Sequence, residues 1–441
     1  MTMALSRRNF VQLLGAAGIS AAASAAFFDE SAANAARYAE GDVSNGSRTP
    51  RGASGRVVIV GGGMAGTSAA RYLRRWGGSG LTLTLVERNT AYTSNIMSNG
   101  VLTGQTTIPS LQYSYAALRN TYGVNVVTAE ALGVNPTAQT VTLSNGSTLG
   151  YDRLVVAPGI VFDALPGLTV GDYDTTYPHA WQAGAQTTLL RNQLMSMPSG
   201  GTFVMTIPPA PYRCPPGPYE RACLVADWLK KNKPGSRVVV LDANPKIMAE
   251  PIAFTEAFTS IHAGVIRYVP NAVIDHVDKA NSTVVTTAES VRFDVFNPIP
   301  PHRAGALAQS AGLVNVGGRW AGVDVLSYES SAVPRIHVLG DAIGTTMPKS
   351  GHIANAQAKV LADAIPKLLT GQALNQAPAT SSACYSPITM TTASWLTGVF
   401  HYDPATRTML VKSIAEAPSI SASNYKDMSK WFTGLMQDTF A

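Results

Sequence analysis

A glycine-rich turn near residue 61 constrains the fold of this chain more than any other feature of the sequence. The segment RVVIVGGGMAGTSAARYLRRW begins at Arg56 with a run of β-branched residues, reaches a G-x-G-x-x-G pattern at Gly61 and continues as an alanine-rich stretch to Trp76. A second apolar run, residues 81–86, ends directly before Glu87. This order predicts a strand, a tight turn, a helix, a second strand and a terminal acid, which together form the βαβ unit that binds a dinucleotide.

Each part of this unit has a predicted role. The first glycine permits the tight turn, the second lets the backbone approach a pyrophosphate, and the third lets the helix pack closely on the strand. The helix N-terminus offers free N–H groups and a positive dipole end to the phosphates, and the acid can accept hydrogen bonds from a ribose. The alternative is a glycine-rich turn without a ligand. The predicted cofactor contacts here are Gly61, Gly63, Met64, Ala65, Gly66, Glu87 and Arg88.

Two later segments indicate which dinucleotide is bound. YDRLVVAPG (residues 151–159) and RIHVLGDAI (residues 335–343) are predicted to be short buried strands that end in turns. They resemble segments that follow the FAD fingerprint in flavoprotein oxidoreductases with two dinucleotide-binding domains, where the aspartate bonds the ribityl chain. Taken alone, Asp341 could instead cap a helix. The predicted FAD contacts in these segments are Ala157, Pro158, Gly159, Gly340 and Asp341.

The chain between these segments predicts a second βαβ unit that lacks a phosphate cradle. Residues 203–205 predict a strand, residues 219–231 a helix, and residues 237–241 a second strand that ends at Asp242. The turn after the first strand reads IPPAPYRCPPGP and holds six prolines and Cys214 where an NAD(P)H domain has glycines. Proline has no N–H to give a phosphate and has a fixed φ, so hydride delivery from NAD(P)H is not expected.

These segments predict an α/β fold with two Rossmann-like, dinucleotide-binding domains of the two-domain flavoprotein oxidoreductase type and a small C-terminal α+β interface domain. A chain of 441 residues is long enough for two or three domains. The FAD domain is expected to be discontinuous because the second domain interrupts it. The predicted ranges are 56–167 and 300–375 for the FAD domain, 168–299 for the second domain and 376–441 for the C-terminal domain.

Composition and charge limit the classes of partner. Hydrophobic residues make up 46% of the chain and charged residues 14%, which is typical of a globular protein. The formal net charge of +6 is spread along the sequence without a run of Lys or Arg. We therefore expect no nucleic-acid partner.

The first 35 residues are predicted to be an export signal. Arg7 and Arg8 precede an apolar stretch of mostly small residues, which resembles the twin-arginine signal, and an A-x-A cleavage site lies at residues 33–35. A membrane anchor is the alternative, but the stretch is short and rich in Ala and Gly for a spanning helix. Residues 36–55 are predicted to be a flexible leader. The mature chain is expected to lack a transmembrane segment and to reside in the periplasm.

The chain has three cysteines, an odd number that in an exported protein predicts one pair and one leftover thiol. Cys214 and Cys384 are predicted to lie in loops, whereas Cys223 falls on the predicted helix and is expected to be a buried small hydrophobe. A purely structural disulfide is one interpretation of the pair of Cys214 and Cys384. No C-x-x-C-H motif occurs, so the chain attaches no c-type haem itself.

Several motifs together resemble the flavoprotein subunit of flavocytochrome c sulfide dehydrogenase. They extend from Arg56 almost to the C-terminus and are VVIVGGGMAG, YDRLVVAPG, CPPGPYERA, IPPHRAG, HVLGDA, MPKSGH, ACYS and QDTF. The resemblance implies FAD as the cofactor, sulfide as the substrate and a c-type cytochrome subunit as the partner. It also implies that Cys214 and Cys384 form a redox-active disulfide beside the flavin, with Glu220 next to the disulfide and Trp431 near the flavin.

One departure from that family concerns the link to the cofactor. Family members that bind FAD covalently use a cysteine in a segment after the second strand. Here that segment reads NTAYTSNIMSNG, and Asn95 occupies the position expected for the cysteine. The FAD is therefore expected to be bound without a thioether bond, with Asn95 among its contacts.

The resemblance also implies a course for the chemistry. Hydrosulfide would attack Cys384 of the disulfide, leaving a persulfide there and releasing Cys214 as a thiolate. Glu220 is a candidate acid/base, and the alternative is a first-turn acid that the helix dipole favours. Lys349, Ser350 and Gly351, at the start of a predicted helix, are expected to place positive charge against the flavin.

Two other functions fit parts of the sequence. A sulfide:quinone oxidoreductase has the same flavin fold and a cysteine pair, but it passes electrons to a membrane quinone through an apolar C-terminal region. In this chain Trp431, Phe432, Leu435 and Met436 form a small predicted apolar patch between polar residues, which suits a protein partner better. The third alternative is a non-catalytic, FAD-bearing interaction protein, and the nearly complete set of site residues argues against it.

Overall fold

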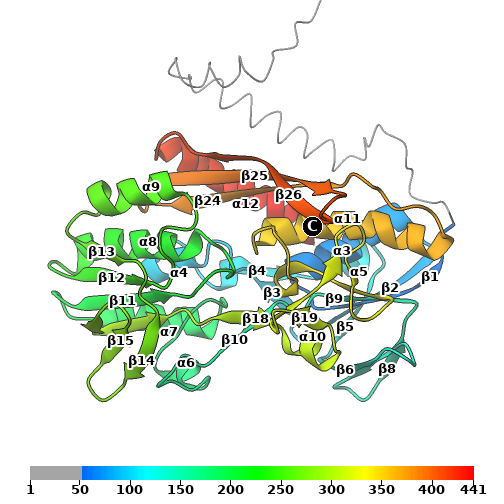
Figure 1. Ribbon diagram of the computed structural model, residues 1–441, viewed down its shortest axis with the longest axis horizontal. Coiled ribbons are helices and arrows are strands. Elements are labelled where there is room, and N and C mark those ends of the chain that lie inside the picture. Colours follow the sequence, from blue (N-terminus) through cyan, green and yellow to red (C-terminus); the bar gives the residue numbers. More distant parts are fainter. Residues whose placement is uncertain (1–51) are drawn as a thin grey trace, which may run out of the picture. The chain divides into compact units, whose positions relative to one another are not determined.

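The computed structural model describes residues 52–441 (Figure 1). The predicted export signal and residues 36–51 of the predicted leader lie outside the described residues. Within the described part of the chain, no helix combines the length and the apolar character needed to cross a membrane.

The strand, turn and helix predicted at the glycine fingerprint are present, and the strand belongs to the first sheet. Its strands β23, β9, β1, β2 and β5 are parallel neighbours in that order, and β22 and β21 extend the sheet antiparallel beyond β23. Helices α3 and α11 pack against each other beside it. The bounds are β1 Gly55–Val60, α3 Met64–Gly77, β2 Leu81–Glu87, β5 Asn125–Thr128, β9 Arg153–Val156, β21 Val323–Asp324, β22 Glu329–Ser330, β23 Ile336–Val338 and α11 Gly351–Thr370.

The fingerprint turn is tight because two of its glycines leave no room for a side chain. Gly61 has a φ of 101°, and a Cβ there would lie 2.2 Å from the carbonyl oxygen of Ala157. A Cβ on Gly66 would lie 1.9 Å from the carbonyl oxygen of Gly61. Strand β9 and helix α3 can therefore approach the end of β1 closely only with glycine at both positions.

The second sheet consists of the parallel strands β13, β12, β11 and β17. Every residue of β11 is buried, as expected for a parallel strand that is covered on both faces. The helix that follows β11 begins at Gly217, two residues before the predicted start, and ends at Asn232. The bounds are α7 Ala185–Ser196, β11 Thr202–Ile207, α8 Gly217–Asn232, β12 Arg237–Asp242, α9 Pro251–Glu256, β13 Ile266–Val269 and β17 Val295–Pro298.

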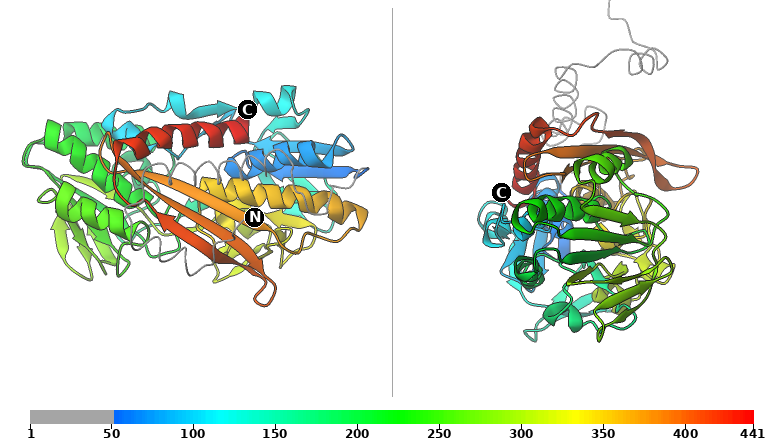
Figure 2. Two further views of the ribbon diagram at one scale, coloured as in Figure 1. Left: turned by 90° about the horizontal axis from the view of Figure 1, so that it is seen from above. Right: turned by 90° about the vertical axis from the view of Figure 1, so that its left-hand side faces the viewer.

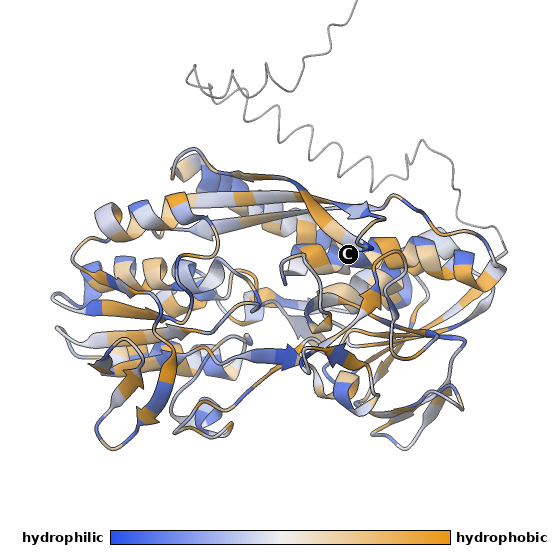
Figure 3. Cartoon of the chain, viewed as in Figure 1, coloured by the Kyte–Doolittle hydropathy of each residue, from blue (hydrophilic) through white to orange (hydrophobic). Residues whose placement is uncertain are grey.

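Short elements complete the two halves. The pair of β10 and β18 lies between the two main sheets, and His302 and Arg303 make β18 polar, so that its arrow is blue at the centre of Figure 3. The bounds are β3 Ala91–Thr93, α4 Asn99–Thr103, β4 Gln112–Ser114, α5 Ala116–Asn120, β6 Ala131–Asn135, β7 Thr140–Leu143, β8 Thr148–Gly150, β10 Ile160–Phe162, α6 Asp172–Thr175, β14 Ile274–Asp278, β15 Thr283–Thr286, β16 Ser290–Arg292, β18 His302–Ala304, α10 Ala306–Ser310, β19 Val314–Val316 and β20 Trp320–Ala321.

The C-terminal segment forms a three-stranded antiparallel sheet and a final helix. The strands are β24 Ala379–Pro387, β25 Ala393–Asp403 and β26 Thr408–Glu416, and the helix is α12 Ala422–Phe440. Strand β24 contacts α11 beside the first sheet and α8 beside the second. This sheet therefore extends over both halves of the fold, as the orange and red strands in Figure 2 show. The predicted fold class is confirmed, while the domain boundaries drawn from the sequence stay a prediction.

The apolar patch expected on the C-terminal helix is a wrong prediction. Leu435 and Met436 are buried in the core that surrounds the first sheet, and Trp431 and Phe432 are partly buried against the same core. Helix α12 contacts α3 and β25, so its apolar positions face inward. The periodicity of these residues marks an amphipathic helix, but it does not distinguish an intramolecular contact from a docking surface.

Candidate functional site

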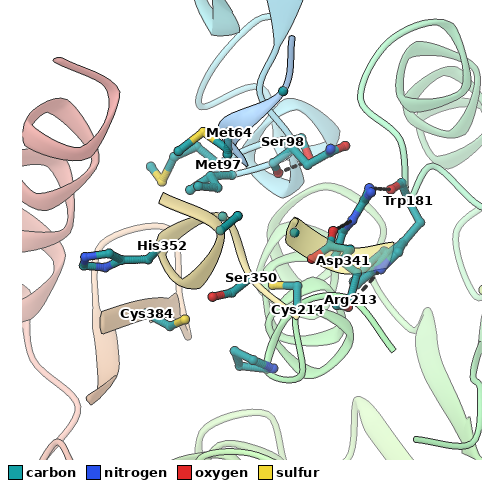
Figure 4. A pocket seen from close by; sticks show the side chains of 18 of the residues that line it. Met64, Met97, Ser98, Trp181, Arg213, Cys214, Asp341, Ser350, His352 and Cys384 are labelled. Atoms are coloured by element: carbon teal, nitrogen blue, oxygen red, sulfur yellow. Dashed lines mark hydrogen bonds and ion pairs between the residues drawn. The ribbon is translucent and has the colours of Figure 1, made fainter. Parts of the chain in front are cut away.

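One cavity is lined by residues from both Rossmann-like halves and from the C-terminal sheet (Figure 4). Most of the predicted site residues line it, although they come from segments far apart in the sequence. The predicted residues at the cavity are Gly63, Met64, Ala65, Asn95, Ala157, Gly159, Cys214, Glu220, Gly340, Asp341, Ser350, Gly351, Cys384 and Trp431. The remaining ones, which do not line it, are Gly61, Gly66, Glu87, Arg88, Pro158 and Lys349.

The start of α3 offers an anion site at this cavity. No acidic residue lies in the first turn of the helix, and no side chain caps its N-terminus. The N–H groups of the first turn are therefore free to bind phosphate oxygens. Gly63 keeps the approach open, because the nearest atom to a Cβ placed there lies 3.9 Å away, on Tyr92. The residues present fit the pyrophosphate of a dinucleotide.

Glu87 supports the same turn. Its Oε2 accepts a hydrogen bond from the Gly62 N–H at 2.7 Å, and its Oε1 accepts one from the Asn89 N–H at 2.9 Å. The predicted ribose acceptor thus also holds the fingerprint turn in place. The neighbouring Arg88 side chain is exposed and lies away from the cavity.

The two cysteines predicted to act together meet at the cavity. Cys214 lies just before α8 with a φ of 56°, and its N–H donates to the carbonyl oxygen of Lys349 at 2.8 Å. Cys384 lies within strand β24, so the prediction that it sits in a loop is wrong. In Figure 4 the two sulfur atoms point toward each other across the cavity. They are not bonded to each other in this structure, and the predicted disulfide stays a prediction.

Both thiols lie in an environment that disfavours a free thiolate. Burial raises the pKa of Cys384 to about 12, and it also raises the pKa of Cys214 well above the ordinary thiol value. A thiolate formed on either residue therefore needs a nearby group that supplies or removes a proton.

Glu220 has the properties of such a group. It lies in the first turn of α8, and burial raises its pKa to about 7, while a hydrogen bond from Asn99 opposes that rise. The Asn99 Nδ2 donates to Glu220 Oε1 at 2.8 Å. A carboxyl group with a pKa near neutrality can both accept and donate a proton at working pH. No sequence signal singled out Asn99, which fixes the orientation of this carboxyl group.

Asp341 has an unexpected partner in the proline-rich turn. Its Oδ2 accepts a hydrogen bond from Arg213 Nε at 2.7 Å, and both side chains are largely buried. A second nitrogen of the Arg213 guanidinium donates to the carbonyl oxygen of Trp181 at 3.2 Å. The sequence analysis missed Arg213, although it is the one basic residue of IPPAPYRCPPGP. It ties the turn that carries Cys214 to the first half of the fold.

The ammonium group of Lys349 is held by two backbone carbonyl groups. Its Nζ donates to the carbonyl oxygens of Asp341 at 3.0 Å and Ile343 at 2.6 Å, and it lies 3.6 Å from the centre of the Trp320 ring. Burial lowers the pKa of this ammonium group to about 8. Its side chain does not line the cavity, and the expectation that it faces the flavin stays a prediction. Ser350 caps α11 by accepting from the Ile353 N–H at 3.2 Å.

Trp431 and Asn95 also line the cavity. Trp431 Nε1 donates to His352 Nδ1 at 3.4 Å, and its ring lies 5.6 Å from that of Tyr385. Asn95 Oδ1 accepts from the Ala183 N–H at 2.7 Å. Asn95 thus bridges the two halves of the fold and offers no sulfur to a cofactor.

Two known protein families match the chain, each over a different range of residues. Residues 55–192 match the pyridine nucleotide-disulphide oxidoreductase family. Residues 187–300 match the family described as the central part of the sulfide dehydrogenase [flavocytochrome c] flavoprotein chain. The chain is therefore a flavin-dependent oxidoreductase by family.

Solved structures share the fold at low sequence identity. Sulfide:quinone oxidoreductase from Aquifex aeolicus superposes with a TM-score of 0.70 at 17% identity, covering 88% of this chain and 92% of that one. An NAD-dependent persulfide reductase from A. fulgidus superposes with a TM-score of 0.58 at 17% identity, covering 87% and 77%. At this level of identity the likeness shows the two-domain flavoprotein fold alone.

Two curated relatives match parts of the sequence. Ferroptosis suppressor protein 1 of Taeniopygia guttata is 33% identical over 116 residues, which are 26% of this chain and 29% of that protein. The flavoprotein chain of flavocytochrome c sulfide dehydrogenase from Chlorobaculum thiosulfatiphilum is 50% identical over 46 residues, which are 10% of this chain and 94% of that sequence. Together with the family match over the second half, this relative shows that the chain belongs to the family of flavocytochrome c sulfide dehydrogenase flavoprotein chains.

Proposed function

We propose that this chain is the FAD-binding subunit of a sulfide dehydrogenase. In this proposal it oxidises sulfide to sulfur or polysulfide through a disulfide of Cys214 and Cys384 and passes the electrons to a c-type cytochrome subunit. We also propose that it is exported in folded form by the twin-arginine route and works in the periplasm.

The observation that carries the proposal is the meeting of the two cysteines. They are 170 residues apart in the sequence (384 − 214) and come from different elements, yet their sulfurs face each other at one cavity. The same cavity holds the partly buried acid Glu220 and the open N-terminus of α3. A purely structural disulfide needs neither an acid/base group nor an adjoining anion site.

The proposed reaction begins with hydrosulfide. Its sulfur attacks Cys384 Sγ of the disulfide, the S–S bond breaks, and the bonding pair leaves with Cys214 as a thiolate. Glu220 then balances the charge on Cys214 by donating its proton, since a thiolate is disfavoured at this buried position. When bound, FAD supplies the acceptor for the two electrons. The assignment of the attack to Cys384 follows the family resemblance.

The second half of the fold lacks the features of an NAD(P)H site, which supports an electron donor other than NAD(P)H. At the end of β12, where such a domain offers an acid to a ribose, Asp242 is buried and accepts hydrogen bonds from Tyr219 at 2.8 Å and Tyr268 at 2.9 Å. The turn before α8 holds prolines in place of free N–H groups. Both parts of a nicotinamide dinucleotide site are therefore occupied by the protein itself.

Electron transfer to a cytochrome is the part of the proposal with a direct rival. The fold is shared with a sulfide:quinone oxidoreductase, so quinone is the alternative acceptor. The family relation to flavocytochrome c chains favours the cytochrome. The remaining alternative, an FAD-bearing protein without catalysis, gives no reason for the partly buried Glu220 beside the cysteine pair.

An anaerobic titration tests these alternatives together. Sulfide is added to the purified holoprotein while the flavin absorbance is followed, and then oxidised cytochrome c or a quinone analogue is added. We expect sulfide to bleach the flavin and cytochrome c to restore the colour much faster than the quinone. Restoration by quinone alone would assign the rival function, and a flavin that sulfide leaves oxidised would overturn the sulfide dehydrogenase.

A further inference from the structure

Glu250 is a buried carboxyl group that the proposed reaction does not yet use. Its side chain is 0% exposed, and its backbone has a φ of 49°, in the left-handed region that a residue with a side chain rarely adopts. It directly precedes Pro251 at the start of α9, yet its carboxyl group does not cap that helix. The side chain is instead directed into the protein.

The contacts of Glu250 leave half of its carboxyl group unpaired. Its Oε1 accepts a hydrogen bond from Ser386 Oγ at 2.5 Å. Its Oε2 is buried and has no hydrogen-bond partner among the described residues, and no ion pair of residues 52–441 includes it. Burying a carboxyl group without a cation is costly, and only the hydroxyl groups of Ser386 and Ser394 oppose the effect of burial on its pKa.

The position of Ser386 places Glu250 on the side of Cys384. Both residues belong to strand β24, two positions apart, and side chains at that spacing project from the same face of a strand. Ser394, on the neighbouring strand β25, pairs with Ser386 and is also completely buried. Glu250 therefore lies against the same face of the sheet from which the Cys384 side chain projects.

Each cysteine has a different carboxyl group as its main charged neighbour. After burial, Glu250 is the largest cause of the raised pKa of Cys384, whereas Glu220 is the largest charged cause of the raised pKa of Cys214. Titratable groups face Glu250 from two further elements, Glu416 from β26 and both Glu220 and Cys223 from α8. Glu416 is partly exposed, and its Oε1 accepts a hydrogen bond at 2.8 Å from the N–H of Ala253. Ala253 belongs to α9 and lies close to Glu250 in the sequence.

We propose that Glu250 exchanges protons with sulfur carried on Cys384, as Glu220 does with Cys214, so that each sulfur has its own carboxyl group. The part that concerns sulfide rests on the proposed function. Burial raises the pKa of Glu250 to about 8, so both of its protonation states are accessible near neutral pH.

In the proposed step, the persulfide on Cys384 loses its proton to Glu250. Attack of HS⁻ on the disulfide gives Cys384–S–SH and the Cys214 thiolate. The persulfide proton then passes to the carboxylate of Glu250, giving Cys384–S–S⁻ and a neutral Glu250. The proton of the substrate has to leave the sulfur, because oxidation of HS⁻ to sulfur yields one proton and two electrons.

The charge coupling is testable without sulfide. In the holoprotein reduced with dithiothreitol and kept anaerobic, the rate of alkylation by iodoacetamide is measured for Cys384 and Cys214 separately, by mass spectrometry, from pH 7 to 11. We expect Glu250→Gln to move the alkylation profile of Cys384 to lower pH by roughly one unit and to leave that of Cys214 in place. Glu220→Gln, the matched variant, should move Cys214 instead. An unchanged Cys384 profile, or an equal shift of both cysteines, would overturn the pairing of Glu250 with Cys384.

A second variant covers the case in which Glu250→Gln does not fold. Ser386→Ala keeps the carboxyl group but removes one of the two hydroxyl groups that lower its pKa, so the pKa of Glu250 rises further. Cys384 should then be alkylated faster than in the wild type near pH 8, because a larger fraction of Glu250 is neutral there. Equal rates would count against the proposal.

The proton-exchange part has its own measurement. The rate of flavin reduction by sulfide is recorded against pH by stopped flow for the wild type, for Glu250→Gln and for Cys223→Ser, a control that keeps both Glu220 and Glu250. The wild type and the control should show an ionisation near pH 8 that Glu250→Gln lacks. If all three profiles coincide, Glu250 exchanges no proton. A wild type that sulfide does not reduce fails the proposed function, while the alkylation result still decides the charge coupling.

Discussion

Cys214 and Cys384 reach the cavity by different routes. Cys214 adopts a left-handed backbone conformation in a turn that the Arg213 and Asp341 pair holds in place. Cys384 has an ordinary strand conformation, with its position fixed by the continuous register between β24 and β25. The pair is therefore presented by two rigid elements, which is a suitable arrangement for a reacting disulfide.

Substitution of the cysteines separates a catalytic pair from a structural one. We expect Cys214→Ser and Cys384→Ser each to abolish flavin reduction by sulfide, while FAD stays bound and dithionite still bleaches it. Cys223→Ser should behave as the wild type, because that thiol is buried in the core of the second half. The measurement is stopped-flow bleaching by sulfide. If Cys384→Ser instead kept wild-type rates and lost about 2–5 kcal/mol of stability, the disulfide would be only structural.

The buried acid Glu250 makes stability depend on pH. Its pKa is raised from 4.5 to about 8 in the folded protein, so the folded state binds a proton that the unfolded state releases. The resulting stability is fully present below about pH 4.5 and is lost as the pH rises to about 8. Relative to Glu250→Gln, the wild type should lose roughly 3–5 kcal/mol of unfolding free energy between pH 5 and 8. Urea unfolding of both proteins at several pH values measures this, and parallel curves would contradict it.

At the scale of elements, the two βαβ units differ in the turn between the first strand and the helix. In the first half, glycines let α3 begin next to β1 and leave its N–H groups open. In the second half, prolines fill the equivalent turn, and the turn carries Cys214. In the proposed function, the same architecture therefore serves cofactor binding in one half and sulfide oxidation in the other.

The fingerprint helix predicts a specific effect of one methyl group. Gly66→Ala should abolish flavin binding and lower the melting temperature, because its Cβ would lie 1.9 Å from the Gly61 carbonyl oxygen and force α3 away from β1. Gly434→Ala in α12, where a Cβ meets nothing within 4 Å, is the matched control and should bind flavin normally. The flavin content of the purified proteins and their melting curves provide the comparison. Normal flavin content in Gly66→Ala would contradict the close packing.

The proline-rich turn predicts that reduced nicotinamides are poor donors. NADH and NADPH should not reduce the flavin at a useful rate, because the turn offers prolines to a phosphate and Asp242 is already bonded to two tyrosines. Dithionite serves as the control that the flavin is reducible. Rapid anaerobic bleaching by NADH would show that the second half binds a dinucleotide after all.

At the scale of the whole molecule, the cavity depends on three parts of the chain at once. Strand β24 contacts helices of both halves. Asn95 and Arg213 each form a hydrogen bond that joins one half to the other. No cysteine occurs in the first half, where a covalent flavin link of this family is formed. The cofactor is therefore expected to be held by packing and hydrogen bonds alone.

Release by acid tests this. Denaturation of the purified protein with acid should leave FAD in the supernatant after the precipitate is removed, and the absorbance spectrum and chromatographic mobility identify it. Flavin that remains with the precipitated chain would contradict the prediction of a non-covalent cofactor.

The sequence by itself determined the parts of this protein that depend on neighbouring residues. The strand, glycine turn and helix from Arg56 to Trp76 were predicted correctly, because alternation, glycine and proline act within a few residues along the chain. The prediction that the proline-rich turn is no phosphate cradle has the same local basis. The pairing of Cys214 with Cys384 came from family resemblance, since no spacing rule links residues so far apart.

Only the tertiary structure decided which side chains from distant segments contact each other. It placed Lys349 against Trp320 instead of in the cavity, turned the apolar face of α12 inward and put Cys384 in a strand. It also brought Glu250 next to the face of β24 that carries Cys384, although nothing in its local sequence marks it. Such contacts join segments that are distant in the sequence, and their energy comes from packing and burial, which leave no periodic pattern along the chain.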